Sequence, residues 1–367
     1  MTETRRAAVM TGPGAPIQLL DIPVPNLGDG AALLRVTYSE VCGTDVHLHH
    51  GRLDGVPYPI IPGHVSVGEI EELGGPISDV EGRPFELGDR VTFLDVHETC
   101  GRCYHCLVTR QSTRCPQRRV YGITYSATEG LLGGWAEALW LKPGVHMLRL
   151  PEELDAETFI GGGCGLVTAM HAIDRAEIRL GNSVAVLGVG PVGQSIIALA
   201  SLSGADRIFA IGDPTARLDF ARRMGATDTL GLSISPAERT SRVRGDTKGF
   251  GVDVVIEASG APEAVSQALD LVRDGGRVVV CGHYTDNGDV RIHPHWQINR
   301  KHVELRGCWG SDFSHFHRAL KVATKHAARI PWREMVSRAY GLHEVNEALA
   351  AVERREVTKA LITPGKT

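Results

Sequence analysis

Four of the eight cysteines in this chain lie close together in the segment CGRCYHCLVTRQSTRC, residues 100–115. Their spacing, C-x2-C-x2-C-x8-C, suits one tetrahedral zinc ion bound by four thiolates: Cys100, Cys103, Cys106 and Cys115. Such a site has no open coordination position, so it stabilises a fold and performs no chemistry. The alternatives are four unrelated cysteines or a small nucleic-acid-binding knuckle.

A second set of potential metal ligands is scattered along the chain. Cys42 lies in EVCGTDVHLHHG, His64 in IPGHVSVGEI and Cys164 in GGGCGLVTAMHA. Two thiolates and an imidazole could form a three-ligand zinc site with an open fourth position, as catalytic zinc requires. Spacing alone does not assemble residues this far apart, and ordinary buried cysteines with a satisfied histidine are the alternative.

A glycine-rich turn, VAVLGVGPVG, indicates a dinucleotide site. Gly188, Gly190 and Gly193 form G-x-G-x-x-G directly after an apolar strand and at the start of a helix, with Val192 inside the same turn. The first glycine allows the tight turn, the second lets the backbone approach a pyrophosphate, and the third lets the helix pack on the strand. The helix N-terminus then supplies N–H groups and a positive partial charge.

The cofactor preference depends on the residue that meets the adenosine ribose. Asp213 in FAIGDP lies at the expected distance, although counting back from the following helix puts Gly212 at the usual acid position. A glycine there also accompanies cofactors with a 2′-phosphate, which need a nearby arginine, and the next basic residue is Arg217. We expect NAD rather than NADP.

These residues need two kinds of domain to position them. Short β-like runs separated by Gly and Pro before residue 150 indicate an irregular β-rich domain. From about Cys164, alternating strands and helices specify a doubly wound parallel sheet of the Rossmann type. We therefore predict a β-rich catalytic domain at 1–163 and 298–367, a zinc lobe at about 95–118, and a dinucleotide-binding domain at 164–297.

Composition limits the function classes. The 39 Lys and Arg residues against 43 Asp and Glu give a net charge of −4, which argues against general nucleic-acid binding. The N-terminus does not have the pattern of a signal peptide, and the uncharged run from Ser183 is split by glycines that a spanning helix avoids. We expect a cytoplasmic protein without membrane partners, in which clustered thiols bind metal.

Taken in order, the motifs resemble the zinc-dependent medium-chain alcohol dehydrogenases. The shared segments are VCGTDVH, IPGH, LGDRV, the four-cysteine lobe, GGWAEA, GGGCGLVTAMHA, the glycine turn and GVDVVIEASG. They cover essentially the whole chain, and their order is more specific than any one of them. The resemblance implies a Rossmann domain, a GroES-like catalytic domain, and two zinc ions per chain.

The resemblance also implies roles for individual residues. Cys42, His64 and Cys164 would bind the catalytic zinc, and the four-cysteine lobe would bind the structural zinc. Thr44 and His47 match the proton relay from the substrate hydroxyl to solvent. Asp45 matches the acid that holds the zinc-binding histidine. Lys359, in VTKAL, matches a basic residue near the cofactor pyrophosphate.

The expected reaction is hydride transfer between a secondary alcohol and NAD, giving the ketone. The segment from Cys100 to Trp140 looks like a subgroup acting on hydroxycamphor and related cyclic alcohols; a polyol or other small alcohol is the alternative. One position departs from the family: Val65 follows His64 where the family usually has Glu. The alternative from another class is therefore a zinc-lobe binding protein without catalysis. A homodimer or homotetramer is the family expectation.

Other residues leave choices open. His49 and His50 fit a polar loop better than a three-histidine clamp with His47. Cys281 and Cys308 fit small buried residues better than reactive thiols. Core packing is the default for Trp135. Trp296 could line a substrate pocket or cover a domain junction.

Overall fold

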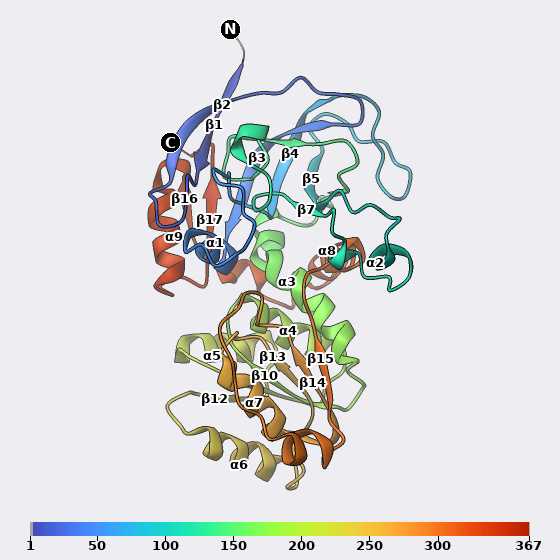
Figure 1. The fold of residues 1–367 in the computed structure, drawn as a ribbon, viewed down its shortest axis with the longest axis vertical. Helices are drawn as coiled ribbons and strands as arrows, with labels where there is room; N and C mark the ends of the chain where they lie inside the picture. The colour runs from blue at the N-terminus through green and yellow to red at the C-terminus, as the bar shows by residue number, and fades with distance from the viewer. Residues whose placement is uncertain (1–2, 367) are drawn as a thin grey trace. The chain divides into compact units, whose positions relative to one another are not determined.

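A computed structural model describes residues 3–366, which fall into two compact units. The first unit contains the chain up to Gly163, Asp312–Ala327 and the segment from Trp332 onward. The second contains Cys164–Ser311 and Ala328–Pro331. The chain therefore leaves the first unit after Gly163, returns to it at Asp312, and contributes the short segment Ala328–Pro331 to the second unit before it returns again (Figure 1).

The first unit is built on an antiparallel-rich sheet. Within the described residues the strand order is β16-β17-β3-β4-β5-β9, and β8 pairs with β3. The bounds of these strands are Val336–Gly341, Lys359–Thr363, Ala32–Val41, Ser66–Leu73, Arg90–Phe93, Met147–Arg149 and Ala138–Leu141. Two smaller sheets pair β1 (Thr4–Val9) with β2 (Gln18–Pro23) and β6 (Val96–His97) with β7 (Arg119–Val120). Strand β17 pairs with β3, so the tail returns to this unit as predicted.

The helices of the first unit are mostly short. Their bounds are α1 Gly43–His49, α2 Tyr104–Leu107, α8 Phe313–His326 and α9 Val345–Glu353. Helix α3, Ala156–Ala176, begins in this unit and is broken at Gly163, whose φ of 45° and ψ of −142° are not helical. Two helical sections therefore meet directly before Cys164.

The second unit is the predicted doubly wound sheet. The strand order within residues 3–366 is β12-β11-β10-β13-β14-β15, with every pairing parallel. Its strands are Asp228–Leu230, Arg207–Ile211, Ser183–Leu187, Val252–Glu257, Val272–Val280 and Glu304–Gly307. Its helices are α4 Pro191–Leu202, α5 Thr215–Met224, α6 Pro236–Asp246 and α7 Pro262–Leu271.

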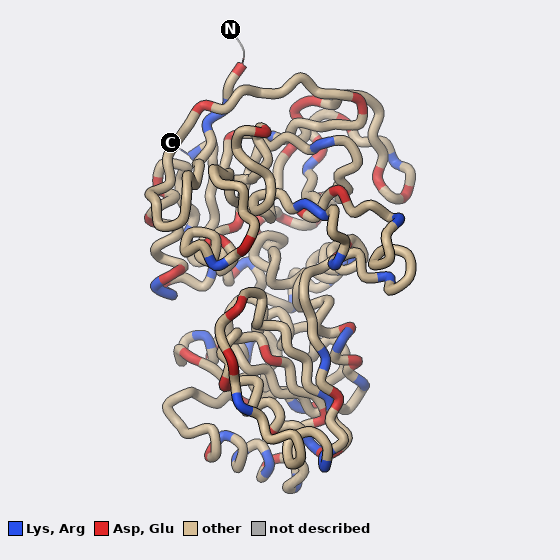
Figure 2. The backbone as a smooth tube through the Cα atoms, in the orientation of Figure 1, with Lys and Arg blue, Asp and Glu red and all other residues tan. Residues whose placement is uncertain are grey.

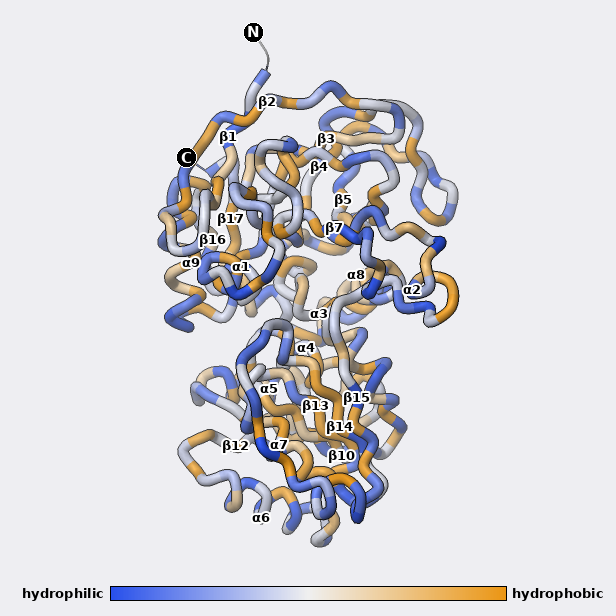
Figure 3. The backbone as a smooth tube through the Cα atoms, viewed as in Figure 1, coloured by the Kyte–Doolittle hydropathy of each residue, from blue (hydrophilic) through white to orange (hydrophobic). Residues whose placement is uncertain are grey.

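Apolar strands at the centre of this sheet match its burial. Residues Val184–Leu187 of β10 are all buried, and β10, β13 and β14 are among the hydrophobic segments in Figure 3. Continuous apolar strands are typical of a parallel sheet covered on both faces. Helix α4 packs on β10 and β11, and α7 packs on β13 and β14.

The later domain boundary differs from the sequence prediction. We expected the dinucleotide domain to end at 297, but the second unit continues to Ser311. The reason is β15, which pairs in parallel with β14 from Arg277↔Glu304 to Val280↔Gly307 and so extends the sheet. Its four residues, ELRG, are only partly apolar and did not indicate a buried strand.

Charged residues of both signs are interspersed along each unit (Figure 2). This pattern fits the small net charge of −4. Among residues 3–366, no helix is both long and apolar enough to cross a lipid bilayer.

Asp253 ties three neighbouring strands of the second unit together. Its Oδ2 accepts hydrogen bonds from the backbone N and the hydroxyl of Ser183, at 2.7 and 2.8 Å, and its Oδ1 accepts one from Nε of Arg273 at 2.7 Å. Partial burial pushes the pKa of Asp253 upward, but these donors outweigh it and hold the pKa below its usual 3.8. The carboxylate is therefore stabilising wherever it is ionised.

We expect Asp253→Asn to lower the free energy of unfolding at pH 7 by about 1–2 kcal/mol, because one charged acceptor is lost. Because the folded pKa lies below 3.8, the deficit persists down to about pH 4 and shrinks only below that. Urea unfolding at several pH values measures this. Asp274→Asn, at an exposed position of β14, is the control, and an equal loss there would contradict the prediction.

Candidate metal centres and dinucleotide site

The structure brings together three potential metal ligands that are far apart in the sequence: Cys42, His64 and Cys164. The first and the last are 122 positions apart. Their ligand atoms all lie within 4.8 Å of one another, and Sγ of Cys42 is 3.8 Å from Nε2 of His64. A tetrahedral zinc with ordinary bond lengths separates a thiolate from an imidazole nitrogen by about 3.6 Å. Cys42 and His64 are buried and Cys164 is half-buried. The donor set therefore fits a zinc ion with one side left open.

The charges around His64 also favour a cation. Burial would lower the pKa of His64, but the Cys42 thiolate and the carboxylates of Asp45 and Asp95 raise it to about 10. The site thus attracts positive charge, and a divalent cation meets that demand while the imidazole stays neutral.

Helix α1 places the predicted relay beside Cys42. Cys42 is the N-cap residue, and Thr44 and His47 are three residues apart, so they share one face of the helix. His47 is half-buried, and burial, with a smaller contribution from Arg52, lowers its pKa below 6.5; Cys42 opposes this shift and His50 adds to it. At neutral pH His47 is therefore uncharged and able to accept a proton.

Asp45 has a different partner from the one predicted. The sequence suggested a hydrogen bond to the zinc-binding histidine, but Oδ2 of Asp45 accepts from the backbone N of Cys42 at 2.8 Å. Within the described part of the chain, neither Oδ1 of Asp45 nor Nδ1 of His64 has a hydrogen-bond partner. The reason is position: Asp45 is residue N3 of α1, where a carboxylate folds back on the N-cap.

Lys359 also differs from its predicted role. Its side chain is fully buried and forms an ion pair with Glu40 at 2.8 Å, so it offers no surface to a cofactor pyrophosphate. The backbone explains this: Lys359 opens β17, which pairs with β3 beside Glu40. Sequence reasoning missed Glu40, whose only signal was an acid near the end of a strand that also contains Arg35.

The four-cysteine lobe is assembled for a metal ion. Sγ of Cys103 is 3.5 Å from that of Cys106 and 4.0 Å from that of Cys115, and the sulfurs of Cys115 and Cys100 are 3.6 Å apart. Thiolates around one tetrahedral zinc are separated by about 3.8 Å. A hydrogen bond from the backbone N–H of Arg102 lowers the pKa of Cys100 to about 6, which favours the thiolate that zinc needs.

The glycine turn has the shape that the sequence predicted. Gly188 has a φ of +112°, and a Cβ there would lie 2.8 Å from the backbone of Ala258. A Cβ on Gly193 would lie 1.9 Å from the carbonyl oxygen of Gly188, so the helix can pack closely only with glycine there. A Cβ on Gly190 would meet no heavy atom of residues 3–366 within 4 Å. That open space fits an approaching pyrophosphate.

Helix α4 begins directly at this turn. Gly190 is its N-cap, Pro191 and Val192 are its first residues, and no side chain in the described chain caps it. Its first N–H groups are thus left for an anion. Asp213 is exposed just after β11, while Gly212 is buried and a Cβ there would be 2.7 Å from Val189. Packing therefore explains the glycine at the usual acid position.

Glu257 is a second residue that sequence reasoning missed. It is fully buried at the end of β13, and its Oε1 accepts from the backbone N of Ser259 and of Gly260, both at 2.7 Å. Its Oε2 accepts from the backbone N of Gly282 at 3.1 Å. Glu257 therefore joins the loops after β13 and β14 at the carboxyl edge of the sheet, where dinucleotides bind.

Several open choices are settled by burial and contacts. Trp135 is fully buried and donates from Nε1 to the carbonyl of Glu40 at 3.0 Å, so it is a core residue. Cys281 and Cys308 are buried too. His50 pairs with Glu353, and His47, His49 and His50 are not among the metal-competent clusters of the described residues. Trp296 is 53% exposed.

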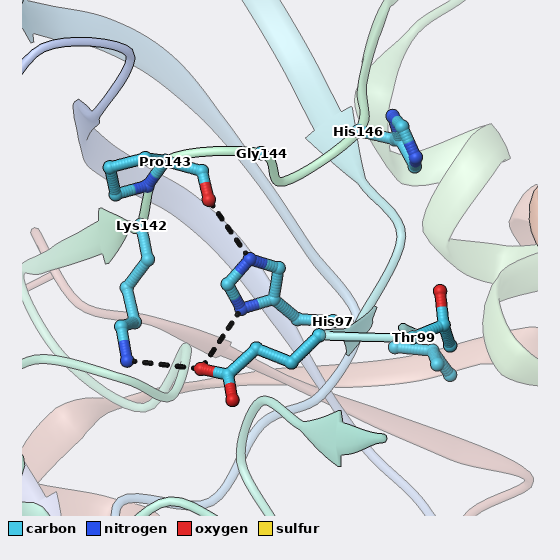
Figure 4. Close-up of a pocket in the computed structure, with 8 residues that line it drawn as sticks. His97, Thr99, Lys142, Pro143, Gly144 and His146 are labelled. Atoms are coloured by element: carbon cyan, nitrogen blue, oxygen red, sulfur yellow. Dashed lines mark hydrogen bonds and ion pairs between the residues drawn. The ribbon is translucent and has the colours of Figure 1, made fainter. Parts of the chain in front are cut away.

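A polar pocket of about 410 Å³ lies next to the four-cysteine lobe (Figure 4). Nε2 of His97 donates to the carbonyl oxygen of Pro143 at 3.1 Å, and Lys142 pairs with Glu98 at 3.2 Å. Thr99 in its wall precedes Cys100. Cys42, His64 and Cys164 are not among its lining residues, so this pocket is separate from the three-ligand cluster.

Three features together define the class of protein: the doubly wound sheet with its open glycine turn, the closed four-cysteine lobe, and the three-ligand metal cluster. They are typical of a zinc-dependent, nucleotide-linked oxidoreductase. Comparison with known families agrees. Residues 28–152 match the alcohol dehydrogenase GroES-like domain, and residues 191–325 match the zinc-binding dehydrogenase domain.

Similar proteins cover nearly the whole chain. 5-exo-hydroxycamphor dehydrogenase of Pseudomonas putida is 31% identical over 360 residues, covering 97% of this chain and 98% of that protein. An alcohol dehydrogenase structure from Thermotoga maritima has a TM-score of 0.94 at 29% identity, covering 98% and 99%. A zinc-binding dehydrogenase from Sinorhizobium meliloti 1021 bound to NADP has a TM-score of 0.86 at 28% identity, covering 99% and 100%. The chain belongs to the zinc-dependent medium-chain alcohol dehydrogenase family and is an oxidoreductase acting on CH–OH donors.

We expect the wild-type protein to hold about two zinc ions per chain, and Cys103→Ser and Cys42→Ser each to hold about one. Cys103→Ser should also lower the melting temperature by several degrees, because a structural zinc contributes to folding directly. Cys42→Ser should affect stability less. Metal analysis by mass spectrometry and thermal unfolding measure both effects. Cys281→Ser is the control, and loss of zinc from it would contradict the assignment.

Proposed function

We propose that this enzyme oxidises a cyclic secondary alcohol of the hydroxycamphor kind to its ketone with NAD. The observation that carries the proposal is the three-ligand cluster, which includes Cys42 at the N-cap of α1, the helix that carries Thr44 and His47. Cys164 is the most exposed of the three ligands. The whole-length similarity to a hydroxycamphor dehydrogenase supports the substrate class. The reverse reaction would use the same groups.

Cys42, His64 and Cys164 would hold the zinc, and the glycine turn with the N-terminus of α4 would hold the pyrophosphate of NAD. When bound, zinc acts as a Lewis acid on the alcohol oxygen and NAD accepts the hydride. The chain itself orients the reactants and moves the proton. Thr44 would accept the hydroxyl proton while giving up its own, and the uncharged His47 would receive the released proton and pass it to solvent.

The proposal is tested with NAD and NADP against small linear alcohols, polyols and bicyclic secondary alcohols. We expect reduced cofactor to form fastest with NAD and a bicyclic alcohol; absorbance at the reduced-cofactor band measures it. A preference for polyols would show that the proposed substrate class is wrong and that the proposed reaction type, alcohol oxidation, is right. No turnover with any alcohol, from protein shown to hold both zinc ions, would favour the non-catalytic binding protein.

His47→Gln should lower the rate of alcohol oxidation by about a hundredfold, the lower end for a lost proton-transfer group. In the wild type the rate should rise with pH through the pKa of His47, which lies below 6.5, because only the uncharged imidazole accepts a proton. Initial rates from pH 5 to 9 measure this. His343→Gln, at an exposed position that does not contribute to the pKa of His47, should keep the wild-type profile.

Asp213 would accept hydrogen bonds from the adenosine ribose and repel a 2′-phosphate. Asp213→Asn should lower kcat/KM for NAD by about ten- to a hundredfold, as expected for a lost hydrogen bond to a charged group. It should also raise kcat/KM for NADP relative to that for NAD. Steady-state kinetics with both cofactors measure the change. Asp219→Asn, on the exposed face of α5, is the control. An unchanged ratio would show that another residue reads the ribose.

We also propose that the chain forms a homodimer or homotetramer. The support is β15, an edge strand of the parallel sheet whose Leu305 is 45% exposed. An unpaired strand edge with an exposed apolar side chain suits pairing with a second copy.

A further inference from the structure

Glu40 and Lys359 form an ion pair from which solvent is excluded. Both side chains are 0% exposed, and Oε1 of Glu40 lies 2.8 Å from Nζ of Lys359. Removing two charges from water is unfavourable and is offset only when further polar groups satisfy them. The surroundings of this pair therefore indicate what it does.

The ammonium of Lys359 meets the end of a helical section. It donates to the carbonyls of Ile160 and Gly162, at 3.0 and 3.2 Å. These carbonyls belong to the last turn of α3 before its break at Gly163, where helix carbonyls lose their own partners. A cation is favourable at that end of a helix. Lys359 thus fixes where the first section of α3 stops.

The carboxylate of Glu40 packs against the break itself. A Cβ on Gly163 would lie 2.1 Å from Oε2 of Glu40 and 2.7 Å from Nζ of Lys359. Gly163 also has a φ of +45°, in the region that favours glycine. The ion pair therefore fills the space that a side chain at Gly163 would need. The residue that follows Gly163 is Cys164.

Glu40 also contacts the segments that carry the other two ligands. Its backbone N donates to the carbonyl of Val65 at 3.0 Å, and Val65 follows His64. Glu40 itself precedes Cys42 by two residues on β3 and its continuation. One residue thus touches all three ligand-bearing segments.

We propose that the Glu40–Lys359 pair is a positioning device for the catalytic metal site. The pair holds the chain at Gly163 in the direction that brings the sulfur of Cys164 to Cys42 and His64. It acts through the backbone and binds neither substrate nor metal. The inference rests on the zinc site of the proposed function, but its test does not need turnover.

The test uses Glu40→Gln and the double variant Glu40→Gln/Lys359→Met. Glu40→Gln leaves Lys359 buried without its counter-charge and is expected to be less stable. The double variant has no unpaired charge, so we expect its unfolding midpoint to recover toward the wild type. Glu69→Gln, which removes an exposed pair with Arg35 on the neighbouring strand, is the matched control.

The readout is zinc release into a chelator, with the four-cysteine lobe as an internal reference. In both Glu40 variants we expect one of the two zinc ions to leave about tenfold faster or more, the usual effect of losing support behind metal ligands. The second ion and the Glu69→Gln protein should behave as wild type. The visible spectrum of cobalt-substituted protein should also change only in the Glu40 variants.

A double variant that regains stability and releases both ions at the wild-type rate would overturn the inference, because the pair would then serve folding alone. Wild-type release from Glu40→Gln would overturn it as well. Failure of the proposed function is a distinguishable result: wild-type protein that holds both zinc ions would show no turnover of any alcohol.

Discussion

The pairing of β3 with β4 on one side and β17 on the other decides where the reactive groups of the first unit lie. Cys42 follows the end of β3, His64 precedes β4 by two residues, and Lys359 opens β17. Because side chains alternate along a strand, a shift of one residue in this register would turn Lys359 to the opposite face and displace the segments that carry Cys42 and His64. The metal cluster is therefore a property of sheet pairing as much as of the ligands themselves.

The second unit uses a different constraint, the carboxyl edge of a parallel sheet. The glycine turn follows β10, and Glu257 at the end of β13 holds the neighbouring loops through backbone N–H groups. A buried carboxylate that accepts several such bonds fixes loops that have few side chains of their own. Cofactor binding thus depends on backbone geometry, whereas the first unit depends on side chains that converge.

This difference explains how much could be predicted. The glycine turn and the four-cysteine lobe are local, so spacing alone indicated their chemistry and the fold around them. Cys42, His64 and Cys164 are joined only by tertiary structure, so their grouping came from resemblance. Lys359 was misjudged and Glu40 was missed because burial and partners follow from packing. Strand β15 was missed because its short sequence has little apolar pattern.

The three glycines of the turn differ in what a side chain at each position would meet. A side chain at Gly188 or Gly193 would collide with the chain's own backbone, so a substitution there disturbs folding whether or not a cofactor binds. A Cβ on Gly190 would meet no heavy atom of the described residues within 4 Å, so a substitution there fits the fold and would obstruct only an approaching dinucleotide. A protein of this fold could therefore lose dinucleotide binding through a change at Gly190 and still fold, whereas a change at Gly188 or Gly193 would remove the fold together with the binding.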